Sequence, residues 1–238
     1  MRFKRLTLLC GHYGSGKTNI AVNLALKLRE EQERVAVADL DIVNPYFRTR
    51  DSEEDFAHAG IRLICSQFAN TNLDLPSMPQ DLYAITDDKS LYTILDIGGD
   101  DRGALALGRI APMINEEQNY EMLMVINGYR PLTRDAASTI EVMREIEAAC
   151  HIAFTGLVNN SNLGEETTAD TVRDSLRYAE ETSKLSGLPI VMTTVEERLY
   201  PLLKEEIPDL FPLKLQKKLS ENMSELKIGD WVTQYAAG

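Results

Sequence analysis

The chain has 238 residues, of which 25 are Lys or Arg and 37 are Asp or Glu, giving a net charge of −12. With 44% hydrophobic residues it is long enough to bury the core of one large domain or two small ones. The excess of carboxylates argues against a surface made mainly for nucleic acids, because such surfaces neutralise phosphates with clustered Lys and Arg. We therefore expect no direct nucleic-acid partner.

The three cysteines, Cys10, Cys65 and Cys150, are odd in number, far apart and set among apolar residues. This pattern predicts buried free thiols of a reducing compartment and no zinc site. The apolar run before Gly11 is too short for a signal peptide, and no stretch approaches the roughly 20 apolar residues that span a bilayer. We expect a cytoplasmic protein without membrane contact.

Short apolar, often β-branched runs alternate along the chain with longer segments of helical pattern. The predicted strands cover residues 6–10, 35–40, 61–65, 91–97, 122–126, 152–158 and 190–194. The spacing of Ile20, Leu24 and Leu28 predicts a helix after the first strand, and Val172, Leu176 and Ala179 predict one before the last. Gly187 and Pro189 mark the end of that later helix.

Nearly continuous apolar strands, each followed by a helix, are typical of a parallel sheet covered on both faces. The predicted fold is therefore α/β: a doubly wound, mostly parallel sheet in a three-layer sandwich. No repeat or linker divides the chain, so residues 1–238 are expected to form a single domain. An amphipathic helical tail from about residue 212 is expected to pack on the sheet.

The segment after the first strand matches the phosphate-binding pattern G-x-x-x-x-G-K-[ST] and leads into a helix. It reads Gly11-His12-Tyr13-Gly14-Ser15-Gly16-Lys17-Thr18. Glycines let successive N–H groups point at phosphate oxygens, and the helix start adds partial positive charge. Lys17 is expected to reach the β- and γ-phosphates, and Thr18 to bind Mg²⁺.

Two other predicted strands end in aspartates, in Asp39-Leu40-Asp41 and in Asp96-Ile97-Gly98-Gly99. A P-loop nucleotidase needs such carboxylates to hold Mg²⁺ and to orient the attacking water. The alternative is that these aspartates cap the helices that follow. After a phosphate loop in the same sheet, the catalytic interpretation is the one we favour.

At these loops the sequence resembles the MinD/ParA/CobQ-like (SIMIBI) branch of P-loop proteins, which includes partition ATPases, the nitrogenase iron protein and dethiobiotin synthetase. The resemblance implies that residues 11–19, through Asn19, surround the nucleotide. It implies that Asp41 and Asp96 open two switch loops, share the Mg²⁺ with Thr18 and, together with Lys17, serve catalysis. It also implies that Asn160 reads the base and that the backbone at Val195 lines it.

Partition ATPases carry an extra lysine in K-G-G-x-G-K-[ST], where this chain has His12. That lysine acts across a dimer, so a cross-subunit mechanism does not transfer directly, although a homodimer remains a candidate. Arg48 and Arg50 are either substitutes for its charge or a solvated basic pair. Arg130 either contacts a substrate or partner or lies in an exposed turn.

The first functional hypothesis is an ATPase switch that binds ATP (or ADP) with Mg²⁺ and acts on an unknown protein or small-molecule partner. Asn160 without the Lys-x-Asp that selects guanine favours ATP over GTP. The alternative is an ATP-dependent ligase or phosphotransferase of the dethiobiotin-synthetase type. A third is a regulator that binds the nucleotide without hydrolysing it.

Overall fold

The computed structural model describes residues 3–40, 52–65, 80–99 and 101–215. Their strands form one eight-stranded sheet in the order β3-β2-β4-β1-β5-β6-β7-β8, and every neighbouring pair is parallel. The strands are β1 (Leu6–Cys10), β2 (Val35–Leu40), β3 (Arg62–Cys65), β4 (Tyr92–Ile97), β5 (Tyr120–Ile126), β6 (Gly156–Asn159), β7 (Ile190–Glu196) and β8 (Leu210–Leu213).

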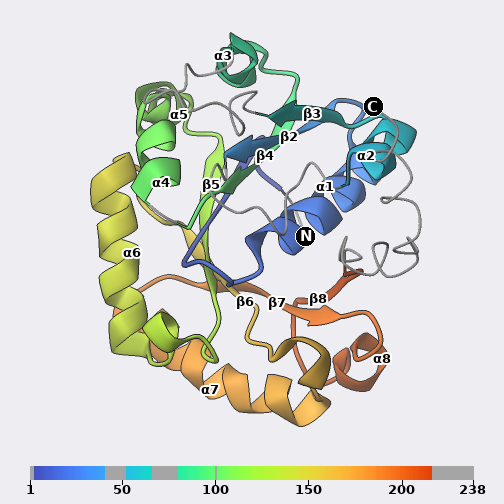
Figure 1. The fold of residues 1–238 in the computed structure, drawn as a ribbon, viewed down its shortest axis with the longest axis vertical. Helices are drawn as coiled ribbons and strands as arrows, with labels where there is room; N and C mark the ends of the chain where they lie inside the picture. The colour runs from blue at the N-terminus through green and yellow to red at the C-terminus, as the bar shows by residue number, and fades with distance from the viewer. Residues whose placement is uncertain (1–2, 41–51, 66–79, 100, 216–238) are drawn as a thin grey trace, which may run out of the picture.

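Helices cover both faces of this sheet (Figure 1). They are α1 (Lys17–Glu31), α2 (Glu53–Ala59), α3 (Gln80–Asp87), α4 (Asp101–Gly108), α5 (Ala111–Glu117), α6 (Ala136–Cys150), α7 (Ala169–Ser186) and α8 (Tyr200–Leu203), with 3-10 turns η2 (Pro131–Thr133) and η3 (Gly164–Glu166). The helices α4, α5 and α6 pack on one face, and α1 and α2 on the other.

Strand alternation sends neighbouring side chains into two separate cores. In β1, Leu8 packs in the core that includes Ile140 of α6, whereas Leu9 packs in the core that includes Ile20 of α1. Both leucines are fully buried. Successive side chains of a strand point to opposite faces of the sheet. A strand that is apolar on both faces must therefore be covered by helices on both faces. The predicted doubly wound, three-layer α/β fold is confirmed.

The predicted strand at 152–158 is too long, since β6 covers only Gly156–Asn159. His151 ends α6 in the left-handed conformation at φ 59°, and the chain then crosses to the sheet. Along this crossing Ile152 and Phe154 are buried, and the Phe154 N–H donates to Glu147 Oε1 at 2.8 Å. The apolar pattern here reflects burial of a connecting segment, which periodicity alone does not distinguish from a strand.

The edge strand β8 was not predicted from the sequence. It pairs with β7 and contains Pro212, a residue that lowers the strand signal but is tolerated at a sheet edge. Pro212 and Leu213, near which the helical tail was expected to begin, belong to β8. The rest of that expected tail, from residue 216, lies outside the described residues.

The sheet topology directs attention to the carboxyl end of β1. The connection from β1 to β2 skips the place that β4 later fills, and the connection from β4 to β5 crosses β1 in the opposite direction along the sheet. Such reversals leave a crevice at the carboxyl ends of the strands, where open α/β sheets bind ligands. The phosphate-loop motif begins there, at Gly11.

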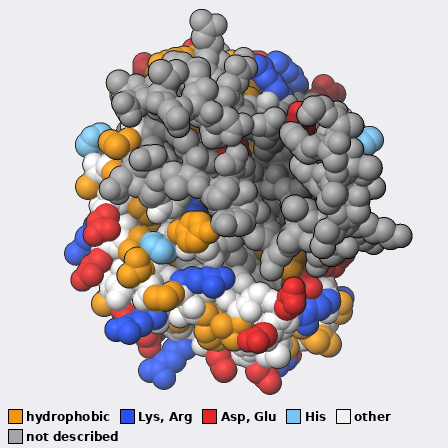
Figure 2. Space-filling model, viewed as in Figure 1, with side chains coloured by type: hydrophobic (Ala, Val, Ile, Leu, Met, Phe, Trp, Pro, Cys, Tyr) orange, Lys and Arg blue, Asp and Glu red, His pale blue; other side chains and the backbone are white. Residues whose placement is uncertain are grey.

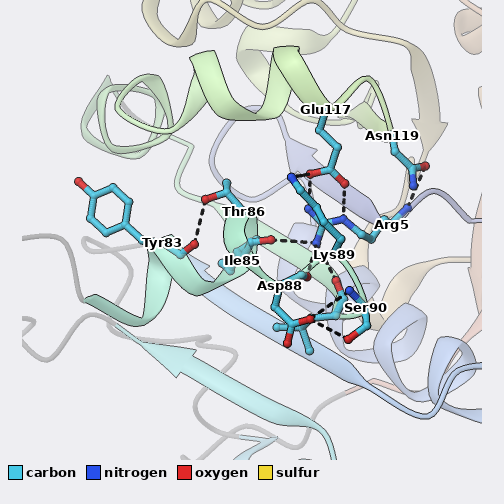
Figure 3. Close-up of polar contacts among 10 residues, drawn as sticks. Arg5, Tyr83, Ile85, Thr86, Asp88, Lys89, Ser90, Glu117 and Asn119 are labelled. Atoms are coloured by element: carbon cyan, nitrogen blue, oxygen red, sulfur yellow. Dashed lines mark hydrogen bonds and ion pairs between the residues drawn. The ribbon is translucent and has the colours of Figure 1, made fainter.

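A buried arginine, Arg5, lies at the other end of β1, directly before its first residue (Figure 3). The Arg5 guanidinium pairs with the carboxylate of Glu117, and its Nη1 donates to the carbonyls of Ile85 and Leu91, each at 2.8 Å. Lys89 Nζ joins Glu117 at 2.9 Å. Arg5 thus ties β1 to α5 and to the end of α3.

Cys10 and Cys150 are free and buried, as predicted. The structure does not describe the side chain of Cys65. Burial is the main cause that raises the pKa of both described thiols, so both stay protonated at neutral pH. Among the described helices, none combines the length and the apolar character that a bilayer crossing requires.

Candidate nucleotide-binding site

The phosphate loop wraps as its glycines predict. Gly11, Gly14 and Gly16 have φ values of 143°, 75° and 92°, in the region that disfavours other residues. A Cβ on Gly11 would lie 2.5 Å from the Val125 carbonyl oxygen, and one on Gly16 would lie 2.2 Å from Asn160 Nδ2. The loop therefore passes too close to its neighbours at Gly11 and Gly16 for another residue to fit without a shift of those neighbours, whereas at Gly14 only the backbone conformation favours glycine.

The helix α1 starts directly from this loop, with Gly16 as its N-cap and no side chain capping it. The first N–H groups of a helix have no partner within the helix, and they suit an anion. The buried Lys17 lies beside them, and its Nζ donates to the Gly11 carbonyl at 2.9 Å and the His12 carbonyl at 3.4 Å. This arrangement places donors and one cation around a space suited to phosphate.

Thr18 and Asp96 meet at the end of the loop. Thr18 Oγ1 donates to Asp96 Oδ2 at 2.7 Å, and both side chains are buried. The register places Asp96 beside Leu9 of β1 and Asp39 of β2. The hydroxyl and the carboxylate are oxygen ligands of the kind that Mg²⁺ prefers.

The glycine pair after Asp96 is packed between the phosphate loop and α4. A Cβ on Gly99 would lie 2.5 Å from the Tyr13 nitrogen. On the other side, a Cβ on Gly103 of α4 would lie 2.7 Å from the Gly98 nitrogen. A shift of this segment must therefore be accompanied by a shift of the phosphate loop or of α4.

Asn160 lies against the phosphate loop. Its Nδ2 donates to the Ser15 carbonyl at 2.7 Å, and its Oδ1 accepts from Thr194 Oγ1 at 2.8 Å. An amide offers two donors and two acceptor lone pairs, so each end retains capacity for a base. Val195 has a buried side chain in a core cluster, which leaves only its backbone to line a ligand.

The sequence left the role of Arg130 open, and the structure places it at the site. Its Nε donates to the Gly14 carbonyl at 2.9 Å. The neighbouring Tyr129 OH donates to the Thr171 carbonyl at 2.9 Å, and burial raises the pKa of that phenol. The position of these residues at a strand end was the only sequence signal for this contact.

The remaining predicted residues either make few contacts at the site or lie outside the described residues. His12 is partly buried and its Nδ1 lies 3.0 Å from the Tyr13 carbonyl, while Tyr13 itself is exposed. Asn19 lies in the first turns of α1, partly buried. Asp41, Arg48 and Arg50 lie outside the described residues. Within the described ranges, no group of three or more His, Cys, Asp or Glu side chains could hold a metal ion.

A parallel sheet with a glycine-rich loop, a buried lysine and an uncapped helix start at its central strand defines a P-loop nucleotide-binding protein. The chain matches the family described as the CobQ/CobB/MinD/ParA nucleotide binding domain over residues 9–211. It belongs to that family, as the resemblance of its loops indicated. No curated protein matches the sequence.

Solved structures with the same fold include FtsY from Mycoplasma mycoides, with a TM-score of 0.54, 17% identity and 82% of this chain covered. The cell division protein FtsY from Thermotoga maritima also has a TM-score of 0.54 and 17% identity, with 83% of this chain covered. The signal recognition particle 54 kDa protein from Aeropyrum pernix, in complex with GDP, has a TM-score of 0.50, 16% identity and 81% coverage.

The match spans 60%, 63% and 41% of these three chains, less than two thirds of each. At such identities the likeness shows a shared fold.

Proposed function

We propose that the chain is a Mg²⁺-dependent ATPase switch. The observation that carries this proposal is the 2.7 Å hydrogen bond between Thr18 and Asp96. It joins the phosphate loop to the strand end whose next residues, Gly98 and Gly99, pack between that loop and α4. A nucleotide that rearranges this contact therefore acts on a segment that cannot move alone.

The residues then take the following roles. The N–H groups of the phosphate loop and of the start of α1 bind the phosphates, and Lys17 turns from the Gly11 carbonyl toward their oxygens. Thr18 and Asp96 would hold Mg²⁺, which when bound neutralises charge on the phosphate oxygens. Asp41 would orient the attacking water, from the segment after β2.

The base end of the site favours adenine in this proposal. Asn160 is followed by Ser161, Asn162 and Leu163, and none of these offers the carboxylate that selects guanine in Lys-x-Asp motifs. Leu163 is exposed at 45%, so an apolar side chain stands where the motif has its acid.

We also propose that two copies of the chain meet at the phosphate-loop edge. Tyr13 and Leu132 are both exposed at 56%, and the Arg130 contact with Gly14 brings their segments together. Figure 2 shows hydrophobic, basic and histidine side chains close together on the part of this face that is not grey. Exposed apolar residues grouped around a site favour a protein contact.

The test is phosphate release and calorimetric binding with Mg²⁺ATP, with Mg²⁺GTP for comparison. We expect Lys17→Ala to weaken ATP binding by about a hundredfold or more, because it removes the cation that faces the phosphates. Lys27→Ala is the matched control, since Lys27 lies on the same helix and pairs with Glu30 in solvent.

Unchanged affinity in Lys17→Ala would refute the phosphate-loop assignment. Tight ATP binding with release only after a small anionic substrate is added would support the ligase alternative.

A further inference from the structure

The backbone at Arg130 is held in place by hydrogen bonds within its own loop. Its N–H donates to the Asn127 carbonyl at 3.1 Å, and its carbonyl accepts from the Thr133 N–H at 3.1 Å. Thr133 Oγ1 also donates to the Asn127 carbonyl at 2.8 Å, and Pro131 restricts the backbone between them. The turn is thus fixed from both sides, which lowers the entropy that Arg130 loses when it binds a ligand.

Three side chains engage the carbonyls of the phosphate loop in order. Lys17 donates to Gly11 and His12 at the start of the loop, whereas Arg130 donates to Gly14 and Asn160 to Ser15. Arg130 therefore shares the end of the loop with the proposed base reader and lies away from the carbonyls that hold Lys17. We expect that end to face the part of the phosphate chain that diphosphates and triphosphates share, because Lys17, held at the start of the loop, is the residue expected to reach the γ-phosphate.

The guanidinium of Arg130 has donors to spare. It carries five N–H groups, of which the Nε–H contacts Gly14. Among the described residues no carboxylate lies within ion-pair distance of Arg130, whereas its neighbour Arg134 has Asp135 at 3.6 Å. In a chain with a net charge of −12, an arginine that has no acidic partner among the described residues and lies beside an anion site is suited to bind the anion itself.

We propose that Arg130 binds the phosphate chain of the nucleotide, at the part shared by di- and triphosphates. It thereby supplies, from the same chain, a positive charge at the loop where His12 replaces a lysine. This inference rests on the proposed function, because it assumes that the site takes a nucleoside polyphosphate.

The test compares Arg130→Gln with Arg134→Gln by calorimetry, using Mg²⁺ATP and Mg²⁺ADP. Glutamine places an amide N–H where Arg130 has its Nε, so it can keep the hydrogen bond to Gly14 while losing the charge. We expect Arg130→Gln to weaken ATP and ADP binding alike, by about tenfold, and to reduce the salt dependence of both affinities. Arg134→Gln should bind as the unchanged protein does.

Normal affinity in Arg130→Gln would overturn the inference, and the role of Arg130 would then be limited to its hydrogen bond to the phosphate loop. A loss for ATP alone would also overturn it, because the contact would then be with the γ-phosphate. Equal losses in both variants would point to a general charge effect and contradict it as well. If the unchanged chain binds neither nucleotide, the proposed function fails together with this inference.

Melting temperatures of the nucleotide-free variants show whether the fold is retained. An Arg130→Lys variant keeps the charge and, if Arg130→Gln were less stable, should recover part of the affinity that the neutral variant loses.

Discussion

Gly103 and Gly108 lie on the same helix, α4, but meet different surroundings. A Cβ on Gly103 would come within 2.7 to 2.9 Å of three backbone atoms of Gly98, whereas one on Gly108 would lie 3.4 Å from its nearest neighbour, the Ala149 carbonyl oxygen. Helix propensity alone favours alanine over glycine by about 1 kcal/mol. We therefore expect Gly103→Ala to lower the free energy of unfolding by about 1–3 kcal/mol, since backbone cannot give way as a flexible side chain can.

Urea denaturation checks this, with Gly108→Ala as the control on the same helix. Gly108→Ala should change stability by less than about 1 kcal/mol. Because Gly98 belongs to the segment packed on the phosphate loop, Gly103→Ala should also weaken nucleotide binding, whereas Gly108→Ala should not. Equal stability of both variants would contradict the close packing of Gly98 against α4.

At the scale of single residues, the sequence predicted the chemistry of the site better than its contacts. The phosphate-loop glycines, Lys17 and Thr18 are set by one local motif, so their place follows once the strand and helix around them are recognised. The hydrogen bond of Arg130 to Gly14 joins residues 116 positions apart and depends on the turn at Pro131. No local pattern specifies such a contact.

Among the elements, α5 is joined to β1 by the buried pair of Glu117 and Arg5. Burial by itself raises the pKa of Glu117, but hydrogen bonds and charge from Arg5 and Lys89 more than offset it, so the pKa lies below its ordinary value. A carboxyl whose pKa is lowered in the folded state stabilises the fold above its unfolded pKa, about 4.3, and loses that contribution as the pH falls through its folded pKa.

We expect Glu117→Gln to be less stable than the unchanged protein at pH 7 and to lose less stability as the pH falls below about 4.3. Denaturation in urea between neutral and acidic pH measures the difference. Parallel pH profiles of the two proteins would contradict the role of the Glu117 charge.

Glu121 of β5 provides a control, because its pKa is shifted in the opposite direction to that of Glu117. Burial raises its pKa, although Thr7 Oγ1 donates to it at 2.8 Å. Its ionised form therefore opposes folding, and stability is lost as the pH rises from the unfolded pKa to the raised one. Glu121→Gln should be at least as stable as the unchanged protein at pH 7, with the difference shrinking at acidic pH.

Two of the interior strands, β1 and β2, were predicted with the bounds that the structure gives them. The bounds of β1 and β2 agree with the predicted ranges, because buried parallel strands are apolar throughout and end at polar loops. The edge strand β8 carries Pro212 and is only partly buried except at Leu213, so its sequence gives little strand signal. Its place follows from pairing with β7, which is a property of the assembled sheet.

For the whole molecule, nucleotide binding and stability are linked. A ligand that binds only the folded state raises its stability by about 2.7 kcal/mol at a concentration 100 times Kd. The phosphate loop sits on β1, which pairs with β4 and β5 at the centre of the sheet. The bound nucleotide therefore stabilises the central strands and, through Gly99 and Gly103, the position of α4.

Charge and apolar exposure then act in opposite directions on the proposed association of two copies. Two chains that each carry −12 repel one another at low ionic strength, and salt screens this repulsion. The exposed Tyr13 and Leu132 favour contact at the phosphate-loop edge. Moderate salt should therefore promote the dimer while it weakens the charge contacts of each chain with the nucleotide.

If the dimer proposed above is the form that hydrolyses ATP, we expect ATP turnover per chain to rise with protein concentration. Leu132→Asp should abolish this rise, since it places a charge among the apolar residues of the proposed interface. Leu185→Asp is the matched control: Leu185 is exposed at 63% near the end of α7, where the chain leads into the amino end of β7 and away from the phosphate loop. Turnover per chain that stays constant, with sedimentation of a single monomeric species in Mg²⁺ATP, would show that the switch works as a monomer.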